Sequence, residues 1–427
     1  MSHNRILLGL VLGATAGVAT NVLTDGGAST QRFVSLVTEP AGRMWLSALI
    51  MTVVPLILCS LSLGVAGLGD LREVGRIGLA TLTIFIVLTA IGATIGITLT
   101  GLFRPGEGID PAMRAELMAA YGTEAKNASG LSSGGLSMDM LVKIVPRNPV
   151  KAAAEGDMLA VIFFSLMLGI GIASLPREKS GTLAAFLESL GHVVVEIIHI
   201  VMKLAPIGVF CLIFSVTARF GFDLLLHLFK YVGIVVAGLV IMMTIVYGVV
   251  LRFVAARSPL AFMKRVRLVI ITAFSTSSSN ATLPTTIEVG QTELGIRKSV
   301  AGFVLPLGAT MNMNGTSLFE GVTVLFLAQV FGIDLSLGQQ VLVIAMSVIT
   351  AVGAAGIPGG SIPFLIIVLG MFGIPPEGIA IVLGVDRILD MCRTVVNVVG
   401  DLVTATIIER MENRASLSRV AESRASA

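Results

Sequence analysis

The sequence predicts an all-α polytopic membrane protein, and three observations support that prediction. Of the 427 residues, 55% are hydrophobic and only 13% are charged, and the mean hydropathy is +0.94; soluble domains are far less apolar. Several uninterrupted apolar stretches reach the length of about 20 residues that a helix needs to cross the hydrocarbon core. Two further apolar stretches are broken halfway by polar or Gly/Pro residues, which is typical of segments that enter a membrane without crossing it as one helix.

Six stretches are candidate spans: residues 6–23, 44–68, 77–103, 158–175, 192–217 and 231–251. The stretch 192–217 is the least purely apolar of them. The first stretch follows a short basic start, as a signal peptide would, but its apolar run is long and more spans follow. We therefore expect it to be a membrane helix.

The placement of basic residues predicts the orientation. The net charge is only +3, yet five basic residues cluster after the 231–251 span, namely Arg252, Arg257, Lys264, Arg265 and Arg267. Under the positive-inside rule that loop is cytoplasmic. Counting outward from it places both termini in the cytoplasm, with an even number of spans.

Two interrupted stretches follow, at residues 266–290 (VRLVIITAFSTSSSNATLPTTIEVG) and 341–373 (VLVIAMSVITAVGAAGIPGGSIPFLIIVLGMFG). The first has a Ser/Thr tip and a second half that Pro284 is expected to close. Each half is too short to cross about 30 Å of hydrocarbon as a helix, so both stretches predict re-entrant hairpins. A serine-rich loop outside the bilayer is the alternative for the first, but a long helix follows each hairpin, at 299–331 and 379–409. This repeat is typical of a transporter binding site.

The last helix carries a polar stripe. At about 100° per residue, its members fall within roughly 100° of arc: Asp386, Asp390, Arg393, Thr394, Asn397 and Asp401. Each charge at mid-membrane costs about 2.5–3.5 kcal/mol before compensation. Pairing of Asp390 with Arg393 would be a purely structural explanation of two of them. As a binding site, the arginine fork fits a carboxylate, an aspartate fits an ammonium group, and Asp401 with Asn397 offers oxygen ligands to a small cation.

The preceding helix contains GATMNMNGTSLFEG, from Gly308 to Gly321. Glycine and asparagine weaken a helix, and an unwound turn would expose carbonyl groups to a cation. Glu320 lies about two turns beyond Asn312 on nearly the same face. Burial would favour its protonated form, so it is a candidate proton carrier; the alternative is a glutamate that is hydrogen-bonded for packing alone.

Six motifs in order make the chain similar to the dicarboxylate/amino acid:cation symporter family: NPVKAAAEGDMLAVIFFSLMLGIGI, APIGVF, STSSSNATLP, NMNGTSLFEG, GAAGIPGGSIP and DRILDMCRTVVNVVGD. The resemblance covers nearly the whole chain. It implies eight transmembrane helices, two re-entrant hairpins with inverted repeats, and a homotrimer in which a transport domain slides past a scaffold in a bacterial-type plasma membrane.

The implied division of the chain follows from the resemblance. It assigns residues 1–76 to the first two helices, which belong to the scaffold, and 77–103 to the third helix, which belongs to the transport domain. Residues 104–155 would form a loop and the start of the fourth helix, and 156–257 the fourth and fifth helices of the scaffold and the sixth helix of the transport domain. The remaining ranges are 258–298 for the first hairpin, 299–333 for the seventh helix with unwound NMNGT, 334–375 for the second hairpin, 376–411 for the eighth helix and 412–427 for a cytoplasmic tail.

The resemblance also implies roles for single residues. Arg393 would bind the side-chain carboxylate and Asp390 the amino group, with hydrogen bonds from Thr394, Asn397 and Thr316. The tips at Ser278, Ser279 and Ile357 to Ser361 would close the site. One sodium site would comprise Gly308, Asn312, Asn397 and Asp401, and another Thr310 with backbone carbonyls near Val352 and Ala354.

Three departures from the family pattern concern a third sodium site. Asn314 stands where the family's NMDGT has a carboxylate, Phe85 and Leu88 stand where a tyrosine and a threonine are usual, and only Thr89 keeps a hydroxyl. Losing these ligands should weaken a cation site, so we expect the third site to be degraded. Glu320 stands where proton-coupled members have their titrating glutamate, which predicts fewer sodium ions and in addition a proton.

The sequence thus predicts a symporter for glutamate or aspartate, with sodium ions and membrane lipid as partners and no cofactor or nucleic acid. A C4-dicarboxylate or neutral amino acid carrier is the alternative within the family; Asp390 argues against a substrate without an ammonium group, and Arg393 against a neutral one. A channel and an intramembrane enzyme are less well matched. The three cysteines lack CxxC spacing, and no histidine beyond His227 could serve a serine nucleophile at Ser277–Ser279.

Overall fold

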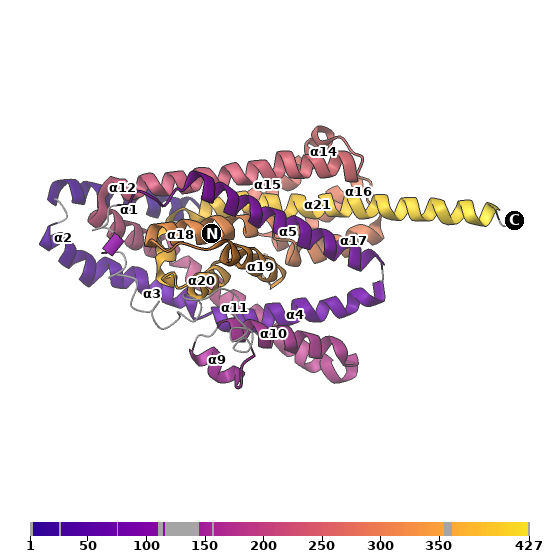
Figure 1. The fold of residues 1–427 in the computed structure, drawn as a ribbon, viewed down its shortest axis with the longest axis horizontal. Coiled ribbons are helices and arrows are strands. Elements are labelled where there is room, and N and C mark those ends of the chain that lie inside the picture. Colours follow the sequence, from indigo (N-terminus) through magenta and orange to yellow (C-terminus); the bar gives the residue numbers. More distant parts are fainter. Residues whose placement is uncertain are drawn as a thin grey trace.

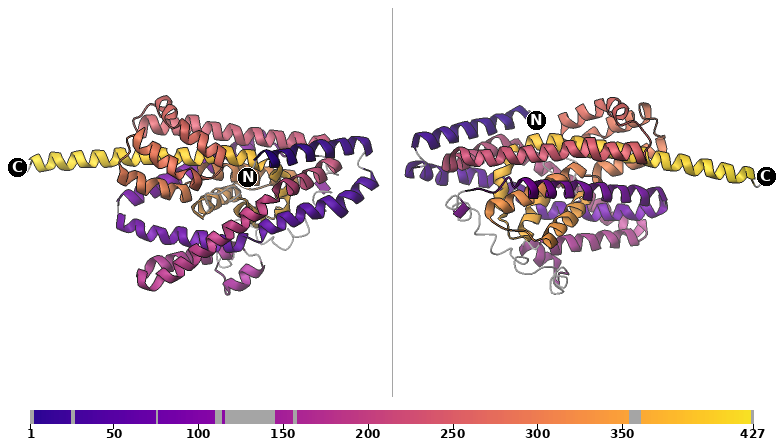
Figure 2. Two further views of the ribbon diagram at one scale, coloured as in Figure 1. Left: turned by 180° about the vertical axis from the view of Figure 1, so that it is seen from behind. Right: turned by 45° about the horizontal axis from the view of Figure 1, so that its top comes forward.

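The computed structural model describes residues 3–24, 27–74, 76–109, 114–115, 145–155, 158–353 and 361–425. Every regular element in these ranges is helical, which confirms the all-α prediction. The helices form an elongated bundle, and the C-terminal helix projects beyond one end of it (Figure 1). The same projection is visible in both further views (Figure 2).

The N-terminal and central helices come first in the chain. They are α1 (His3–Thr24), α2 (Ala28–Phe33), the π-helix η1 (Val34–Thr38), α3 (Glu39–Ile50), α4 (Val53–Val74), α5 (Arg76–Phe103), α9 (Pro149–Glu155), α10 (Met158–Ser174), α11 (Arg177–Lys203) and α12 (Ala205–Ile241), which continues through the π-helix η2 (Met242–Val246), α13 (Tyr247–Val249) and the π-helix η3 (Val250–Val254). Helices α1 and α3 pack on α12, whereas α10 and α11 pack on α4.

The remaining helices lie in the C-terminal half of the chain. They are α14 (Pro259–Arg265), α15 (Arg267–Thr276), α16 (Ser279–Thr292), α17 (Lys298–Met311), α18 (Asn314–Phe331), α19 (Leu337–Gly353), α20 (Ile362–Met371), the 3-10 helix η4 (Pro376–Ile379) and α21 (Ala380–Ala425). Helices α12, α15, α17 and α18 all pack against α21, and α5 packs against α18. The buried core therefore lies around α18 and the first part of α21.

Within the described residues, five stretches are long and apolar enough to cross a membrane: Ala28–Ala66, Ile77–Phe103, Arg177–Lys203, Leu225–Val254 and Ala380–Asn413. The predicted span 77–103 matches α5, while the predicted span 44–68 runs across the junction of α3 and α4. The predicted span 192–217 is wrong as a single helix, because α11 ends at Lys203 and α12 begins at Ala205 with Pro206 in its first turn. Proline fits a first turn but disrupts a helix interior.

Helix α12 contains a second interruption. Gly221 has φ 64° and ψ −147°, a conformation that is essentially restricted to glycine. The amide nitrogen of Asn21 in α1 donates to the carbonyl oxygens of Ala218 and Arg219 at 3.1 and 3.2 Å. These are the carbonyl groups that a helix end leaves unpaired. The predicted span 231–251 is thus part of a longer helical stretch that begins after Gly221.

Two of the predicted breaks in the C-terminal half are present in the described residues. Helices α15 and α16 are separated by Ser277 and Ser278, and α17 and α18 by Asn312 and Met313. Pro284 does not close the second half of the first interrupted stretch, as the sequence predicted, because it is accommodated inside α16, which continues to Thr292. Helices α19 and α20 flank the second interruption, most of which lies outside the described residues. The expected tail from residue 412 continues α21 as a helix to Ala425.

Candidate functional site

Four charged residues lie buried together on α21. Asp386, Arg387, Asp390 and Arg393 occupy about two turns of this helix, and Arg393 is only 1% exposed. Two acids and two arginines make the cluster formally neutral. A charge in a membrane span normally needs such a partner, so this composition makes the burial possible.

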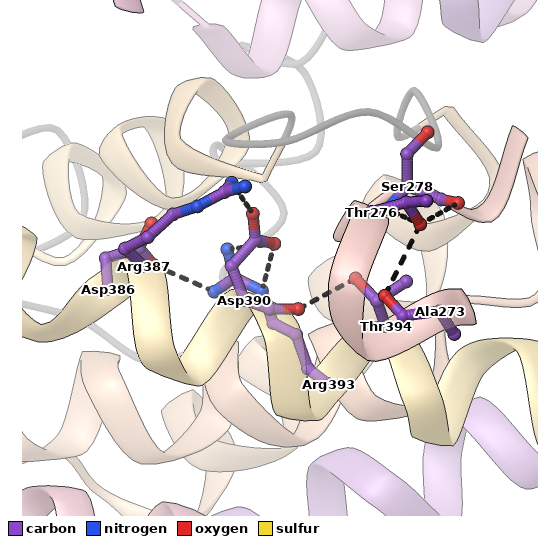
Figure 3. A network of polar contacts seen from close by, with 8 residues as sticks. All are labelled: Ala273, Thr276, Ser278, Asp386, Arg387, Asp390, Arg393 and Thr394. Atoms are coloured by element: carbon purple, nitrogen blue, oxygen red, sulfur yellow. Dashed lines mark hydrogen bonds and ion pairs between the residues drawn. The ribbon is translucent and has the colours of Figure 1, made fainter. Parts of the chain in front are cut away.

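The ion pairs join both arginines to the aspartates. Arg393 Nη1 lies 3.0 Å from Asp386 Oδ1, and Arg393 Nη2 lies 2.9 Å from Asp390 Oδ1. Arg387 Nη1 lies 3.3 Å from Asp390 Oδ2, so the Asp390 carboxylate lies between two guanidinium groups (Figure 3). The Arg393 guanidinium also lies 4.1 Å from the ring centroid of Phe319, within the range of a cation–π interaction.

Asp390 and Arg393 therefore form the ion pair that would explain their burial on structural grounds alone, and Arg393 also forms an ion pair with Asp386. Arg387 does not belong to the predicted polar stripe. Its spacing was a usable signal, because residues three apart on a helix are neighbours and Arg387 precedes Asp390 by three positions. The guanidinium of Arg393, a group that can bind a carboxylate bidentately, lies buried in the core of the bundle.

Asn397 joins α21 to the start of α18. Its Oδ1 accepts from the backbone N–H of Gly315 at 2.7 Å and of Thr316 at 3.3 Å, and its Nδ2 donates to Thr316 Oγ1 at 3.1 Å. The first N–H groups of a helix have no hydrogen-bond partner within that helix. The side chain of Asn397 on α21 therefore supplies the acceptor for these groups of α18. A Cβ atom on Gly315 would lie 2.5 Å from the Arg393 carbonyl oxygen. Glycine thus permits the close approach that brings Thr316 and Asn397 beside Arg393.

Thr394 is buried next to Arg393, and its hydroxyl donates to the backbone oxygen of Asp390 at 2.7 Å. In the view of Figure 3, Thr394 lies on the side of the charged cluster that faces Thr276 and Ser278. Helix α15, which carries Thr276, packs against α21. The turn after α15 is therefore part of the surroundings of the charged cluster.

The tip of the first hairpin is buried. Ser278 caps α16, with its Oγ accepting from Ala281 N at 3.1 Å, and Ser279 begins that helix. Ser277 adopts a left-handed conformation with φ 50°, which is uncommon outside glycine and asparagine. The hydroxyls of Ser277 and Ser361 are buried without a hydrogen-bond partner among the described residues. This burial argues against a polar loop in solvent; Ile357 and Ala354 lie outside the described residues.

The side chains of Asn312 and Asp401 lie close together where α17 ends. Asn312 Nδ2 donates to Asp401 Oδ1 at 2.8 Å, while Asn312 Oδ1 is buried without a partner in the described part of the chain. A Cβ atom on Gly308 would meet the Asp401 carboxylate, so α17 and α21 approach closely there. The side-chain oxygen of Asn397 does not join these residues, because it accepts a hydrogen bond from the backbone N–H of Gly315 in α18. Gly308, Asn312 and Asp401 are thus together, with an unpaired oxygen that a cation could use.

The second predicted sodium site is not assembled among the described side chains. Thr310 is exposed, and its hydroxyl donates to the Leu307 carbonyl oxygen of its own helix at 3.0 Å. Val352 lies near the end of α19. The backbone that would complete this site after Val352 falls in residues that the structure does not describe.

Asn314 lies in a closed hydrogen-bond network. Thr89 Oγ1 donates to Asn314 Oδ1 at 2.9 Å, and Asn314 Nδ2 lies 3.0 Å from the hydroxyl oxygen of Tyr247. The Tyr247 hydroxyl in turn donates to the Val396 carbonyl oxygen at 2.9 Å. The two apolar residues of the expected degraded site, Phe85 and Leu88, are buried. Both ends of the amide are therefore satisfied without a cation; Tyr247 gave no recognisable signal in the sequence.

Glu320 is 1% exposed on α18, and its Oε2 accepts a hydrogen bond of 3.0 Å from Thr350 Oγ1 on α19. Its other oxygen, Oε1, is buried without a partner among the described residues. No described basic side chain forms an ion pair with it. A buried carboxyl group with one free oxygen is suited to holding a proton.

The chain is similar to known proteins over most of its length. The sequence profile described as "Sodium:dicarboxylate symporter family" matches residues 3–411. The Proton/glutamate-aspartate symporter of Escherichia coli (strain K12) is 36% identical over 410 residues, covering 96% of this chain and 92% of the relative. The Proton/sodium-glutamate symport protein of Bacillus subtilis (strain 168) is 35% identical with the same coverage. A C4-dicarboxylate transport protein of Anaeromyxobacter sp. (strain K) is 32% identical over 419 residues, 97% of this chain and 90% of the relative.

Proposed function

The chain belongs to the sodium:dicarboxylate symporter family, and from this premise we propose that it is a secondary symporter for glutamate or aspartate, driven by sodium ions and a proton. The relatives named as glutamate and aspartate symporters support this substrate. The observation that carries the proposal is the fully buried Arg393, which lies in a membrane-spanning helix and is held by two aspartates.

The substrate site follows from the chemistry of the cluster. Arg393 binds the side-chain carboxylate of the substrate through its planar fork. The aspartates that pair with Arg393 stabilise its charge until a substrate carboxylate takes over part of that contact. Asp390 receives the substrate ammonium group, and Thr394, Asn397 and Thr316 supply further hydrogen bonds. Ser278, Ser279 and the segment from Ile357 to Ser361 close over the bound substrate.

Sodium ions are cargo that is moved with the substrate. The oxygens of Asp401 and Asn312, with the backbone at Gly308, support one sodium site, to which Asn397 contributes once its oxygen is released from α18. A second site uses Thr310 with the backbone near Val352 and Ala354. The hydrogen-bond network of Asn314 supports the absence of a third site, because its amide has neither a charge nor an uncommitted oxygen to offer.

Glu320 carries the coupled proton. Its burial and its unpaired oxygen support this role. The hydrogen bond from Thr350 connects it to the first arm of the second hairpin. Exchange of a proton at Glu320 would therefore alter a contact between α18 and α19.

The transport cycle that we propose is an elevator movement. The transport domain comprises the third and sixth to eighth helices and both hairpins, and it slides past a scaffold of the first, second, fourth and fifth helices. Three copies assemble through the scaffold, surrounded by membrane lipid, with both termini in the cytoplasm. The protein is a multi-pass membrane transporter rather than an enzyme, and paired hairpins fit alternating access better than an open pore.

Uptake of labelled aspartate into proteoliposomes tests the proposal. Inward sodium and inward proton gradients are imposed separately, and each is expected to accelerate uptake, with fewer than three sodium ions moved per aspartate. A stoichiometry of three sodium ions without proton dependence would refute the coupling. Aspartate flux that continues without any coupling ion would favour a channel.

A further inference from the structure

A cavity of about 190 Å³ lies beside α14, at the end of the bundle from which α21 projects (Figure 1). It is bounded by α14 and the residues before it, by the turn that follows α16, and by α21. The lining of this α14 cavity includes Arg257, Ser258, Phe262, Arg265, Leu294 and Thr406. A water molecule occupies about 30 Å³ in the liquid, so the cavity has room for a group of the size of a phosphate.

Arg257 and Arg265 bring positive charge to the α14 cavity, and no acidic side chain is among the described residues that line it. Arg265 Nη1 donates to the Glu293 carbonyl oxygen at 2.9 Å, and Arg257 Nη2 makes a longer contact of 3.5 Å with the Leu294 carbonyl oxygen. Because these carbonyl groups belong to consecutive residues, both guanidinium groups lie on the same side of the cavity. A guanidinium has five N–H donors, so each arginine keeps donors that the backbone does not use.

The charge of these two arginines is not neutralised by an acid in the described parts of the chain, where neither of them forms an ion pair. Glu409, one helical turn after Thr406 on α21, is already paired with Arg297 at 2.8 Å. A further arginine, Arg410, donates to the carbonyl oxygen of Val254. An anion in the cavity would therefore reduce the repulsion between like charges.

The α14 cavity lies next to the end of a membrane span. The apolar stretch Leu225–Val254 ends just before the first residues that line the cavity. Phe253 and Leu260 on the same segment are 75% and 78% exposed, and exposed apolar side chains beside basic ones are typical of a segment at a membrane surface. The basic residues predict a cytoplasmic position, and the cytoplasmic leaflet contains anionic lipids, whose headgroups bind in basic pockets between helices.

We propose that the α14 cavity binds the phosphate group of an anionic phospholipid of the cytoplasmic leaflet. Arg257 and Arg265 hold the phosphate oxygens through charge-assisted hydrogen bonds, and the acyl chains lie along Phe253 and Leu260. These apolar side chains favour a lipid over a soluble phosphate ion. The inference goes beyond the proposed function and does not depend on which substrate is transported.

The bound lipid would connect two parts of the fold. Both arginines belong to the segment between the span and α15, and both contact the backbone that follows α16, the second arm of the first hairpin. A phosphate group held by both arginines would draw on donors that remain free, so these backbone contacts can persist. The lipid thus stabilises the position of α14 against the base of this hairpin.

Lipid binding is measured by native mass spectrometry on the purified full-length protein in detergent, titrated with phosphatidylglycerol or with phosphatidylcholine. Transport plays no part in this readout. The cavity variant is Arg257→Gln/Arg265→Gln. The matched control is Arg252→Gln/Lys264→Gln, which removes the same charge from two exposed residues of the same segment that do not line the cavity. Inorganic phosphate is added as a soluble competitor.

We expect the wild type and the control variant to bind phosphatidylglycerol at least about tenfold more tightly than phosphatidylcholine. The cavity variant should lose this preference to within about threefold. The proposal is overturned if the wild type has no preference, if the cavity variant retains it, or if the control variant loses it as well. Displacement of phosphatidylglycerol by an equimolar amount of inorganic phosphate would show that the cavity takes a soluble phosphate, and it would overturn the assignment to a lipid.

Arg257→Gln alone keeps the test decisive if the double variant does not fold. Arg257 has the longer of the two backbone contacts, so its loss should disturb the fold less than the loss of Arg265. We expect this single variant to lower the preference for phosphatidylglycerol at least about threefold. An unchanged preference would overturn the proposal.

Discussion

Arg393 Nη1 lies 3.0 Å from Asp386 Oδ1, a residue two helical turns earlier on the same helix. Arg393 therefore extends along α21, between an acid two turns away and Asp390 one turn away. A buried charge that loses its partner costs about 3–5 kcal/mol. In the proposed substrate complex, the substrate carboxylate would be a replacement partner for Arg393, so that this buried guanidinium stays paired when it leaves an aspartate.

Replacing Arg393 with lysine tests the bidentate contact. Lysine keeps the charge but has no planar fork, so it cannot hold Asp386, Asp390 and a substrate carboxylate together. We expect kcat/KM for aspartate uptake by Arg393→Lys to fall by about 100-fold or more. Arg219→Lys serves as the control and should retain uptake, because Arg219 is also a poorly exposed arginine in an ion pair, 2.6 Å from Glu39, but lies on α12 away from the cluster. A loss of less than about threefold in Arg393→Lys would contradict the assigned role.

Glu320→Gln tests the proton carrier. Glutamine keeps the size of the side chain and an oxygen for Thr350, whose hydroxyl is 3.0 Å from Glu320, but it cannot exchange a proton. With equal sodium concentrations on both sides of the membrane, the acceleration of uptake by an inward pH gradient should disappear in this variant, while sodium-driven uptake persists.

Glu409→Gln is the matched control for this measurement. Glu409 is also buried, but its Oε1 is paired with Arg297 Nε at 2.8 Å. Proton-driven uptake should persist in Glu409→Gln. If Glu320→Gln still responded to the pH gradient as the wild type does, the coupled proton would have to be carried elsewhere.

Asn314→Asp tests the hydrogen-bond network that occupies the expected third sodium site. The aspartate would remove the Nδ2 donor to Tyr247 and add a buried charge without a cation partner, at a cost of roughly 3–5 kcal/mol. In detergent without sodium we expect a Tm several degrees lower than in the wild type, with sodium restoring part of the loss. Equal Tm values of the two proteins in sodium-free buffer would show that the network is not important for stability.

Gly221→Ala tests the interruption of α12. Gly221 has a φ of 64°, and an added Cβ would lie 2.8 Å from Asn21 Oδ1. Residues held in such a conformation cost about 1–3 kcal/mol, so the Tm should fall. Gly233→Ala is the control in the same helix, where a Cβ would meet nothing within 4 Å. The two variants should differ clearly; equal Tm values would mean that the backbone adapts at residue 221.

The sequence was most informative where a chemical pattern is local. The span 77–103 and the break at Asn312 follow from runs of apolar residues and from helix-weakening residues, and both are present in the structure. The break at Leu204 was missed because the apolar pattern continues through it, and only Pro206 marks the start of a new helix. Gly221 was missed for the same reason, because its φ depends on Asn21 and on the packing of α1.

The sequence predicted most of the residues of the candidate site, but not which of them contact one another. Helical spacing gave the stripe on α21, but the partners of each residue depend on contacts between distant segments. Asn314 and Tyr247 are 67 positions apart, and Asn397 and Gly315 are 82 apart. Periodicity carries no information on such pairs. Arg387 is the exception, since its position one turn before Asp390 was visible in the sequence.

A structure determined with aspartate and sodium bound tests the central claim most directly. We expect density for the substrate in the buried site on α21, with its side-chain carboxylate within hydrogen-bonding distance of the Arg393 guanidinium. Aspartate bound elsewhere, while Arg393 keeps both of its contacts, with Asp386 and with Asp390, would contradict the proposed substrate site.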